Sequence, residues 1–432
     1  MAKVLTFCRT IRNNWKKSLV GAALLTYGVS YSKDVYDTKQ LMREYCKSIS
    51  QYGDNSLPTN LKPRHVTVIL NPVAKKGKAK KLFKDYCEPL LHLAGIAVTI
   101  LQTESENAAR KLIMDLDTPT DAIIVAGGDG TLSDVLTGLV RKYNANLNSV
   151  KQCPIGILPL GQTSKIAKSL YHEYDHLTDV KQILEATIAI ISEKYKMMDI
   201  IEIEPIEHNP EEPVKPIYAM GAIEWGAWQD AHALTKKYWY WGPLKKYVTY
   251  ILNGYKMNLN HYCNAIIKYT PPCEGCSRCS QKNFLNVPSN MNKRWWHVFV
   301  PRNPITEDTI DYSKVINENC GIFHELSVST SELHIEASNI NKLQVASPSS
   351  LKIEIGPKNI NYLSFMTQGW KQENSNKLEC EQIVEAKNIE LIPQRVDKEC
   401  TLHIDNDEYE LKPININLVS RAVKIFCSEL NS

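Results

Sequence analysis

The stretch VAGGDGTLSDV, from Val125 to Val135, follows the apolar run DAIIVA and precedes a segment with helical spacing of apolar residues. Glycines at a strand end let the backbone approach a phosphate without obstruction by Cβ atoms. The helix that follows offers free N–H groups and a partial positive charge to an anion. Asp129 adds one carboxylate, which can hold a metal-bound water or accept a proton from a hydroxyl. An ordinary tight turn is the alternative.

Strands and helices alternate around this stretch. We expect strands at 65–71, 97–102, 121–126 and 154–158, and helices at 78–94, 106–116, 131–143, 164–170 and 177–191. This alternation is typical of βαβ units and a parallel sheet. After about residue 193, short alternating segments such as SELHIEA, LKIEIG and WHVFVP dominate, which indicates an antiparallel sheet or sandwich. We therefore predict an α/β domain over residues 62–192 and an all-β sandwich domain over 193–432.

Two further glycine-containing loops follow predicted strands. NPVAKKGKAKKLF begins at Asn71 and places Gly77 and several lysines at a helix start, where cations are unfavourable unless an anion lies nearby. LPLGQTSK places Gly161 and Thr163 after the fourth strand. Ligands of open α/β sheets bind at the carboxyl ends of strands, so three such loops favour one shared phosphate site. A solvated basic face is the alternative for the lysines, and the sequence contains neither a P-loop motif nor G-x-G-x-x-G.

The composition limits the class of protein. The chain has 432 residues, 43% of them apolar, and a net charge of +4, which is typical of a two-domain globular protein and not of a nucleic-acid binder. Its 12 cysteines are scattered, which argues against a disulfide framework. Cys273, Cys276 and Cys279 have metal-like spacing in CEGCSRC, although a structural zinc site needs a fourth ligand. A metal site, a disulfide and incidental thiols in a solvated loop are the alternatives.

The N-terminal segment differs from the rest of the chain. Residues 1–33 carry basic but no acidic side chains, and the apolar run from Ser18 to Tyr31 is shorter than the roughly 20 residues of a spanning helix. Basic, acid-free N-termini are typical of mitochondrial targeting, so we expect residues 1–61 to form a targeting and membrane segment with a linker. A fraying basic helix is the alternative. The aromatic run KYWYWGPLKKY, from Lys237 to Tyr247, suits either a core or a membrane interface.

Taken together, NPVAKKGKA, VAGGDGT, LPLGQTS and EWGAWQDA resemble the diacylglycerol kinase-like lipid kinases, a family that includes the sphingosine and ceramide kinases. The resemblance runs from about residue 64 to the C-terminus. It implies a phosphofructokinase-like α/β domain and a β-sandwich, with ATP and lipid meeting between them. It also implies ATP- and Mg²⁺-dependent phosphorylation of the free hydroxyl of monoacylglycerol or diacylglycerol, which gives lysophosphatidic or phosphatidic acid.

The resemblance also assigns site residues. It places the nucleotide at Asn71, Gly77, Lys78, Gly127, Gly128, Asp129, Gly130, Thr131, Gly161, Thr163 and Lys245. Asp129 would act near the metal and the reacting hydroxyl, and Asp230 would meet the lipid head group, with His232 where the family has a second aspartate. IDNDEYE is similar to the family's late Asp-Gly-Glu motif, which makes Asp405 the metal ligand and Asp407 the catalytic residue. Two carboxylates at i and i+2 on a strand face the same way, although a polar hairpin tip is the alternative.

The resemblance further implies a location and partners. It indicates the mitochondrial inner membrane, with the kinase domains in the intermembrane space and membrane lipids as partners. An alternative of another class is a non-catalytic scaffold, a subunit of the mitochondrial inner-membrane carrier translocase. The intact GGDGT favours an active kinase, and both roles can coexist.

Overall fold

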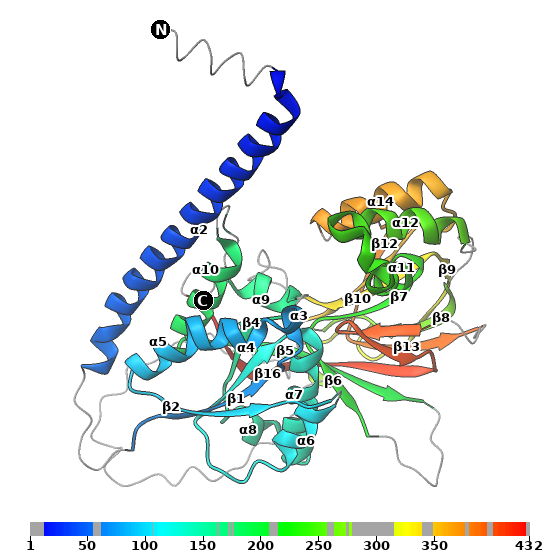
Figure 1. Ribbon diagram of the computed structural model, residues 1–432. Helices are drawn as coiled ribbons and strands as arrows, with labels where there is room; N and C mark the ends of the chain where they lie inside the picture. Colours follow the sequence, from blue (N-terminus) through cyan, green and yellow to red (C-terminus); the bar gives the residue numbers. More distant parts are fainter. Residues whose placement is uncertain are drawn as a thin grey trace, which may run out of the picture.

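The structure is a computed structural model. It describes residues 13–54, 62–105, 107–161, 164–171, 174, 177–206, 215–256, 263–273, 276–278, 315–338, 349–375, 380–394 and 401–428. Within these residues the chain forms one ten-stranded mixed sheet and one six-stranded antiparallel sheet (Figure 1).

Four parallel strands open the fold. They are β1 (His65–Leu70), β2 (Ala97–Gln102), β3 (Ala122–Gly127) and β4 (Ile155–Pro159), and they lie in the order β2-β1-β3-β4. β3 and β4 are buried along their whole lengths, because helices cover both faces of a parallel sheet. The predicted α/β architecture is confirmed.

Nine helical segments accompany these strands. They are α3 (Ala74–Gly77), α4 (Ala79–Leu82), η1 (Phe83–Cys87), α5 (Glu88–Leu93), α6 (Ala108–Met114), α7 (Asp129–Lys142), α8 (Leu147–Val150), α9 (Lys165–Leu170) and α10 (Thr178–Ile191) within the described residues. Figure 1 shows α5 and α10 on one face of the sheet and α6 and α7 on the other. Helix α7 begins earlier than predicted, so Asp129 lies in its first turn, at the positive end of the helix dipole.

The second half of the chain is a sandwich. Its strands are β5 (Tyr195–Pro205), β6 (Ile217–Ala219), β7 (Ala222–Gly226), β8 (Cys263–Thr270), β9 (His324–Thr330), β10 (Glu332–Ala337), β11 (Leu351–Ile355), β12 (Gln382–Ala386), β13 (Asn388–Pro393), β14 (Thr401–Ile404), β15 (Asp407–Glu410) and β16 (Ile414–Phe426). The first sheet continues from β4 as β16-β13-β8-β9, and the second has the order β12-β11-β10-β7-β14-β15. Trp225, Ile267 and Ile335 belong to the core between them. The predicted sandwich is confirmed, whereas the expected strand WHVFVP lies outside the described residues.

Strand β16 connects the two halves. Near its end Ile425 pairs with Ile155 of β4 in parallel, while the rest of β16 pairs antiparallel with β5 and β13. Ile425 and Phe426 belong to the core of the α/β half, and Ile416 belongs to the core of the sandwich. The predicted boundary at residue 192 assigns β16 to the sandwich domain, but the end of β16 lies in the α/β half.

Four helical segments lie over the second sheet (Figure 1). They are α11 (Ala227–Ala233), η2 (Leu234–Leu244), α12 (Lys245–Lys256) and α14 (Tyr362–Ser375), and we call them the helical group. Trp228 and Phe365 stack at its centre with ring centroids 5.6 Å apart. In the predicted aromatic run Tyr238 is buried, whereas the neighbouring exposed aromatic residues are Trp239, Tyr240 and Trp241.

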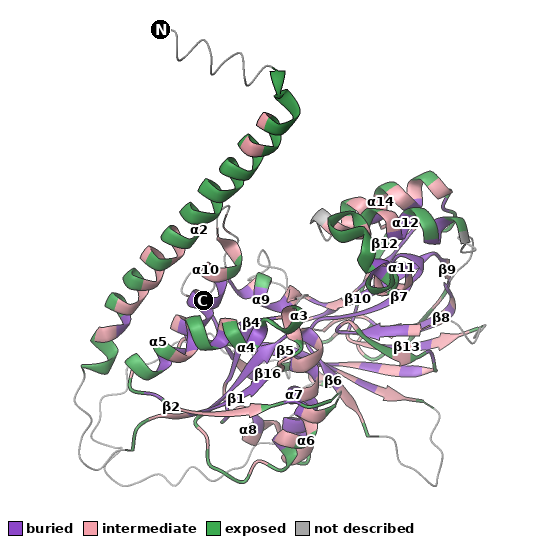
Figure 2. Cartoon of the chain, viewed as in Figure 1, coloured by how far each residue is buried: buried purple, intermediate pink, exposed green. Residues whose placement is uncertain are grey.

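A helix of 39 residues, α2 (Trp15–Gly53), precedes β1. Its second half packs on α5 and α10, and Ile49 is buried in the core of the α/β half. Its first half projects away from the rest of the chain, with Leu24, Leu25 and Tyr27 exposed (Figure 2). In the part of the chain described, no helix is both long enough and apolar enough to cross a membrane.

Candidate active site

The turn between β3 and α7 forms the centre of the site. Gly127 ends β3, Gly128 caps α7 in an extended conformation, and Asp129 is the first helical residue. A Cβ atom on Gly127 would lie 2.7 Å from Thr131 Oγ1, so the turn leaves no room for a side chain there. Asp129 is 4% exposed, and its Oδ2 accepts a 2.9 Å hydrogen bond from the Lys165 backbone N–H. Burial raises the pKa of Asp129 to about 6.

The loop after β1 is bonded to this turn. The Asn71 side-chain amide donates to Thr131 Oγ1 over 3.2 Å, and Asn71 Oδ1 accepts from the Val73 backbone N–H. Because β1 and β3 are parallel neighbours, with Leu70 opposite Ala126, their loops leave the sheet at the same edge. The structure thus brings together two of the three loops that the sequence singled out.

The lysine-rich segment after Asn71 forms a left-handed turn. Lys75, Lys76 and Gly77 have φ angles of 49°, 60° and 79°. Left-handed backbone is strained for lysine and unstrained for glycine, so Gly77 has a conformational reason to be glycine. Lys75 Nζ forms a 2.7 Å ion pair with Asp179 of α10, which explains this lysine without a ligand. Lys78 is exposed at the start of α4, with its ammonium group available to an anion.

The third loop leaves the same edge of the sheet. Gly161 is half-buried two residues after Pro159, which lies opposite Gly127 in the β3–β4 pairing. Thr163 lies outside the described residues. The expected convergence of three strand-end loops at one edge is therefore present in the backbone.

The hairpin between β14 and β15 contains the late acidic motif. Asp405 and Asn406 form its two-residue turn, with φ angles of 50° and 69°. Two consecutive left-handed residues define a type I′ turn, in which glycine, asparagine and aspartate are favoured. The expectation that Asp405 and Asp407 share one strand face is wrong, because Asp405 lies in the turn and β15 begins at Asp407.

Asp405 is bound to backbone amides. Its Oδ1 accepts from the N–H groups of Gly221 and Ala222 over 2.9 and 3.0 Å, and its Oδ2 accepts from Met220 over 3.1 Å. Burial, and then the neighbouring charge of Asp129, raise the pKa of Asp405 to about 8. Asp405 therefore fastens the hairpin to the segment that precedes β7.

Asp407 lies against the N-terminus of α7. A Cβ atom on Gly130 would lie 2.5 Å from either carboxylate oxygen of Asp407. Only glycine at position 130 therefore leaves room for the Asp407 side chain. Asp407 is exposed, unlike the buried Asp129 and Asp405. The fold thus joins the GGDGT turn to a carboxylate from the far end of the chain.

Carboxylates of this kind are the ligands that Mg²⁺ prefers. Mg²⁺ takes oxygen ligands, usually one or two carboxylates together with substrate phosphates. Burial raises the pKa values of Asp129 and Asp405, and the Asp129 charge raises that of Asp405 further, so a nearby cation would be favourable. Asp407 suits a ligand position with Asp129 nearby, since the oxygens of Asp405 already accept three amide N–H groups.

An ionic chain, which the sequence analysis missed, runs from beside Asp129 into the sandwich, with Glu224 and His334 buried and Lys165 partly exposed. Lys165 Nζ lies 2.5 Å from Glu224 Oε1 on β7. His334 Nδ1 of β10 lies 3.2 Å from the same oxygen, and its Nε2 lies 3.4 Å from Glu336 Oε2. Burial would raise the pKa of Glu224, but Lys165 and His334 hold it well below its usual value. Burial would lower the pKa of His334, but the two glutamates raise it to about 9.

Further polar residues lie on the same face of the second sheet. Glu332 Oε2 accepts from the Trp228 backbone N–H over 3.0 Å, and burial raises the pKa of Glu332 to about 8. Asp230 Oδ1 accepts from Thr401 Oγ1 over 3.1 Å and lies 3.2 Å from His403 Nε2. Asp230 is thus held at the face that the helical group covers.

His232 and Lys245 lie within the helical group. His232 Nδ1 is 2.6 Å from Glu373 Oε1, and Lys246 Nζ is 2.8 Å from Glu373 Oε2. Burial would raise the pKa of Glu373, but its contacts with His232 and Lys246 hold it at about 2. Lys245 is the first residue of α12. A phosphate-binding role for Lys245 stays a prediction.

Comparison with known proteins identifies the family. Residues 65–203 match the family model of the diacylglycerol kinase catalytic domain, and residues 220–431 match that of the acylglycerol kinase C-terminal region. The mitochondrial acylglycerol kinase of Homo sapiens is 32% identical over 431 residues, which cover 98% of this chain and 96% of the relative. The chain belongs to the acylglycerol kinase family.

Other comparisons agree with the acylglycerol kinase family. The mitochondrial acylglycerol kinase of Xenopus laevis is 32% identical over 438 residues, 99% of this chain and 96% of the relative. Sphingosine kinase 1 of Homo sapiens is 28% identical over 180 residues, 41% of this chain and 45% of the relative. A solved structure assigned as a diacylglycerol kinase from Bacillus anthracis has a similar fold, with a TM-score of 0.50 at 16% identity over 86% of this chain and all of that one. This acylglycerol kinase family member is a lipid kinase.

Proposed function

We propose that this lipid kinase transfers the γ-phosphoryl group of ATP to the free hydroxyl of monoacylglycerol and diacylglycerol. The products would be lysophosphatidic acid and phosphatidic acid. The contact of Asp407 with Gly130 carries the proposal, because it adds a second carboxylate to Asp129 at one helix N-terminus. Phosphoryl transfer needs positioned phosphates, neutralised charge and a base for the acceptor hydroxyl. The names of the relatives support acylglycerols as the substrate class.

The nucleotide phosphates would bind at the three strand-end loops. The N–H groups that open α7 and the exposed ammonium of Lys78 supply positive charge there. Gly127 and Gly128 allow the phosphates to approach the backbone. The proposed nucleotide residues remain Asn71, Gly77, Lys78, Gly127, Gly128, Asp129, Gly130, Thr131, Gly161, Thr163 and Lys245.

The three aspartates would have different tasks. Asp129 would accept the proton of the lipid hydroxyl, since a pKa of about 6 suits a base that works near neutral pH. Asp407 would hold Mg²⁺ near Asp129, and the ion when bound neutralises phosphate charge. We propose Asp405 as a positioning residue and no longer as the metal ligand, because its oxygens accept three backbone amides.

The lipid head group would bind on the sandwich side, at Asp230. Hydrogen bonds from Thr401 and His403 orient the Asp230 carboxylate toward them. The exposed aromatic residues of the helical group, Trp239, Tyr240 and Trp241, are of the type enriched at membrane interfaces. Asp230 and these residues lie in consecutive helical segments, α11 and η2, which supports entry of lipid from a membrane at the helical group.

The protein would act at the mitochondrial inner membrane, facing the intermembrane space. The relatives named mitochondrial support the organelle, and the exposed apolar half of α2 supports a membrane contact. Removal of residues 1–33 keeps Ile49 docked and should release the protein from membranes at high salt, which strips purely electrostatic binding. If the truncated protein still sediments with mitochondrial membranes, the exposed aromatic residues of the helical group are the next candidate anchor.

The catalytic proposal is tested with the purified full-length chain in detergent, ATP and Mg²⁺. We expect phosphorylation of monoacylglycerol and diacylglycerol in preference to sphingosine and ceramide. Gly128→Glu is the matched negative control, since it places a side chain and a negative charge where phosphates would bind, and it should abolish ATP binding in a folded protein. Transfer to none of the lipids by the wild-type chain would contradict the proposal and favour the translocase-subunit alternative.

A further inference from the structure

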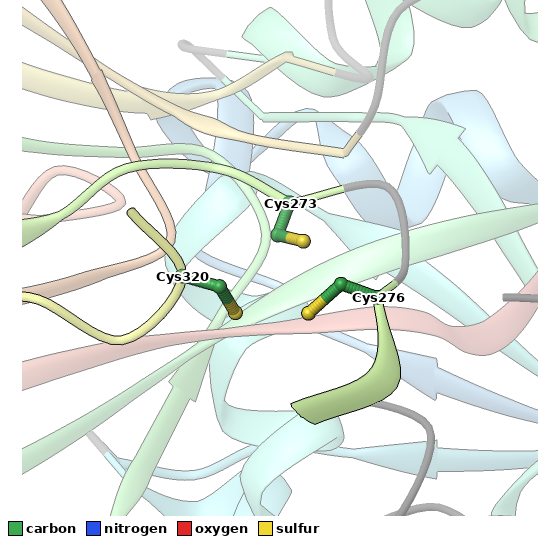
Figure 3. A group of neighbouring side chains, drawn as sticks. All are labelled: Cys273, Cys276 and Cys320. Atoms are coloured by element: carbon green, nitrogen blue, oxygen red, sulfur yellow. The ribbon is translucent and has the colours of Figure 1, made fainter. Parts of the chain in front are cut away.

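Three cysteines meet at the connection between β8 and β9. Cys273 lies three residues after the end of β8, and Cys276 lies shortly after Cys273. Cys320 precedes β9. Their sulfur atoms all lie within 4.8 Å of one another. Figure 3 shows the three thiols turned toward one another from two separate segments of the chain. Cys320 was not singled out by the sequence analysis, because many residues separate it from the Cys273–Cys276 pair.

The two segments are fixed to one another by hydrogen bonds. The Ser277 backbone N–H donates to the Val315 carbonyl over 2.9 Å, and Arg278 Nη1 lies 3.4 Å from the carbonyl oxygens of Glu318 and Cys320. These hydrogen bonds fix the two segments that carry the three thiols relative to one another.

One sulfur also receives a hydrogen bond from outside the group. Asn317 Nδ2 donates to Cys273 Sγ over 3.4 Å. Donors of this kind orient metal ligands and stabilise the charge on a thiolate. Cys276 is fully buried and the other two are half-buried, so the group is largely shielded from solvent.

The geometry distinguishes a metal site from a disulfide. A disulfide joins two sulfurs and leaves the third without a role, whereas tetrahedral Zn²⁺ with Zn–S bonds of about 2.3 Å holds sulfurs about 3.8 Å apart. Three sulfurs within 4.8 Å of one another match the second arrangement. Soft thiolates select Zn²⁺ over hard cations such as Mg²⁺.

We propose that Cys273, Cys276 and Cys320 bind a structural Zn²⁺ ion. The three thiolates supply three of the four positions that zinc uses, and each thiol releases its proton to solvent on binding. Cys279, the third cysteine of CEGCSRC, lies outside the described residues, and the fourth zinc position would be taken by solvent or by a residue outside them.

The zinc site would close the base of a long connection. β8 and β9 are antiparallel neighbours at the edge of the first sheet, but the chain between them runs from Pro271 to Phe323. Bringing the ends of such a segment together costs conformational entropy, which a metal cross-link near both ends offsets. The site is on the opposite edge of the sheet from β2, and it would act on stability and not on phosphoryl transfer.

The test measures metal in the full-length chain, purified under reducing conditions without chelators. We expect about one zinc ion per chain by atomic emission, falling to near zero in Cys276→Ser and in the triple variant Cys273→Ser/Cys276→Ser/Cys320→Ser. Cys380→Ser is the matched control, because Cys380 is also half-buried but lies outside the group, and it should keep the metal. Chelation should lower the midpoint of thermal unfolding of the wild type and leave the triple variant unchanged.

A wild-type measurement covers the case in which the serine variants fail to fold. Co²⁺ exchanged into the intact protein should give the intense near-ultraviolet bands of thiolate-to-cobalt charge transfer. Wild-type protein without zinc and without these bands would overturn the proposal. So would a disulfide between any two of the three cysteines in the native protein, or a triple variant that keeps its zinc.

Discussion

Asp129 lies between two regions that are built in different ways. On the α/β side, the site is made of loops that follow β1, β3 and β4, and each loop is a few consecutive residues such as those around Asn71 and Gly127. On the sandwich side, the site is made of single charged residues on separate strands, Glu224 on β7 and His334 on β10. The first region uses backbone groups and glycines, and the second uses buried ion pairs.

This difference matches the two ligands that we propose. A nucleotide phosphate carries its own charge and needs a backbone that lets it approach, which short glycine-rich loops provide. An acylglycerol head group is neutral and small, so its orientation has to come from side chains that are themselves fixed. The ionic chain from Lys165 through Glu224 to His334 gives that fixation, because each charge has a partner.

The largest expected effect separates two aspartates of one hairpin. Asp407→Asn should lower kcat by about 10²- to 10⁴-fold and change the free energy of unfolding little, because Asp407 is exposed at the proposed metal site. Asp405→Asn should lower the free energy of unfolding by about 1–3 kcal/mol, since an amide NH₂ would face a backbone N–H. Steady-state kinetics and urea unfolding measure the two effects. Unchanged turnover in both variants would show that the motif is only a polar hairpin tip, without a role in catalysis.

The second prediction concerns the ionic chain. Lys165→Met leaves the buried Glu224 without its main cation, and should lower the free energy of unfolding by about 2 kcal/mol; water reaches the lysine, which limits the loss. Lys168→Met on the same helix is the control and should have almost no effect, because Lys168 is exposed. Equal stability of the two variants would show that the chain does not support the sandwich side.

The third prediction tests the assignment of the two ligands to the two regions. Lys78→Ala should raise KM for ATP about tenfold with little change in KM for lipid. Asp230→Asn should raise KM for lipid about tenfold with little change in KM for ATP. The reason in both cases is that a charged hydrogen bond contributes about 1.5–3 kcal/mol. Both constants are measured with each variant in detergent-dispersed lipid. A change in the same constant for both variants would contradict a division of the site between the two regions.

The smallest expected effect is a shift in a pH profile. Burial raises the pKa of Asp129 to about 6, and the proposed base works only when ionised, so kcat/KM should fall about tenfold per pH unit below that value. A bound cation favours the ionised form, and higher Mg²⁺ should move this limb to lower pH by about one unit or less. If the acidic side of the pH profile does not move with Mg²⁺ concentration, Asp129 does not lie near the metal.

Most of the architecture could be predicted from the sequence, because apolar period and glycine position are local signals. The strand 97–102 and the loop residues Gly127 and Asn71 were found in this way. Lys165 closed the quoted motif LPLGQTSK, but nothing local shows that its side chain meets Glu224. That contact depends on packing between α9 and β7, and the register of β7 against β10 then places His334 opposite Glu224. A polar hairpin tip was one of the two alternatives for Asp405, because Asp-Asn is ordinary turn chemistry, and the structure places Asp405 in that turn.

Strand β16 has a consequence for the order in which the protein is made. It is the last strand described, yet it pairs with β4 and also supplies residues to both cores. A nascent chain released only as far as Pro413 has the GGDGT turn and every nucleotide loop, but its first sheet has an open edge at β4. Neither half can be completed before β16 has been synthesised, and until then apolar surface on both stays uncovered. Premature termination anywhere before Ile414 should therefore leave aggregation-prone chains and no separately folded nucleotide domain.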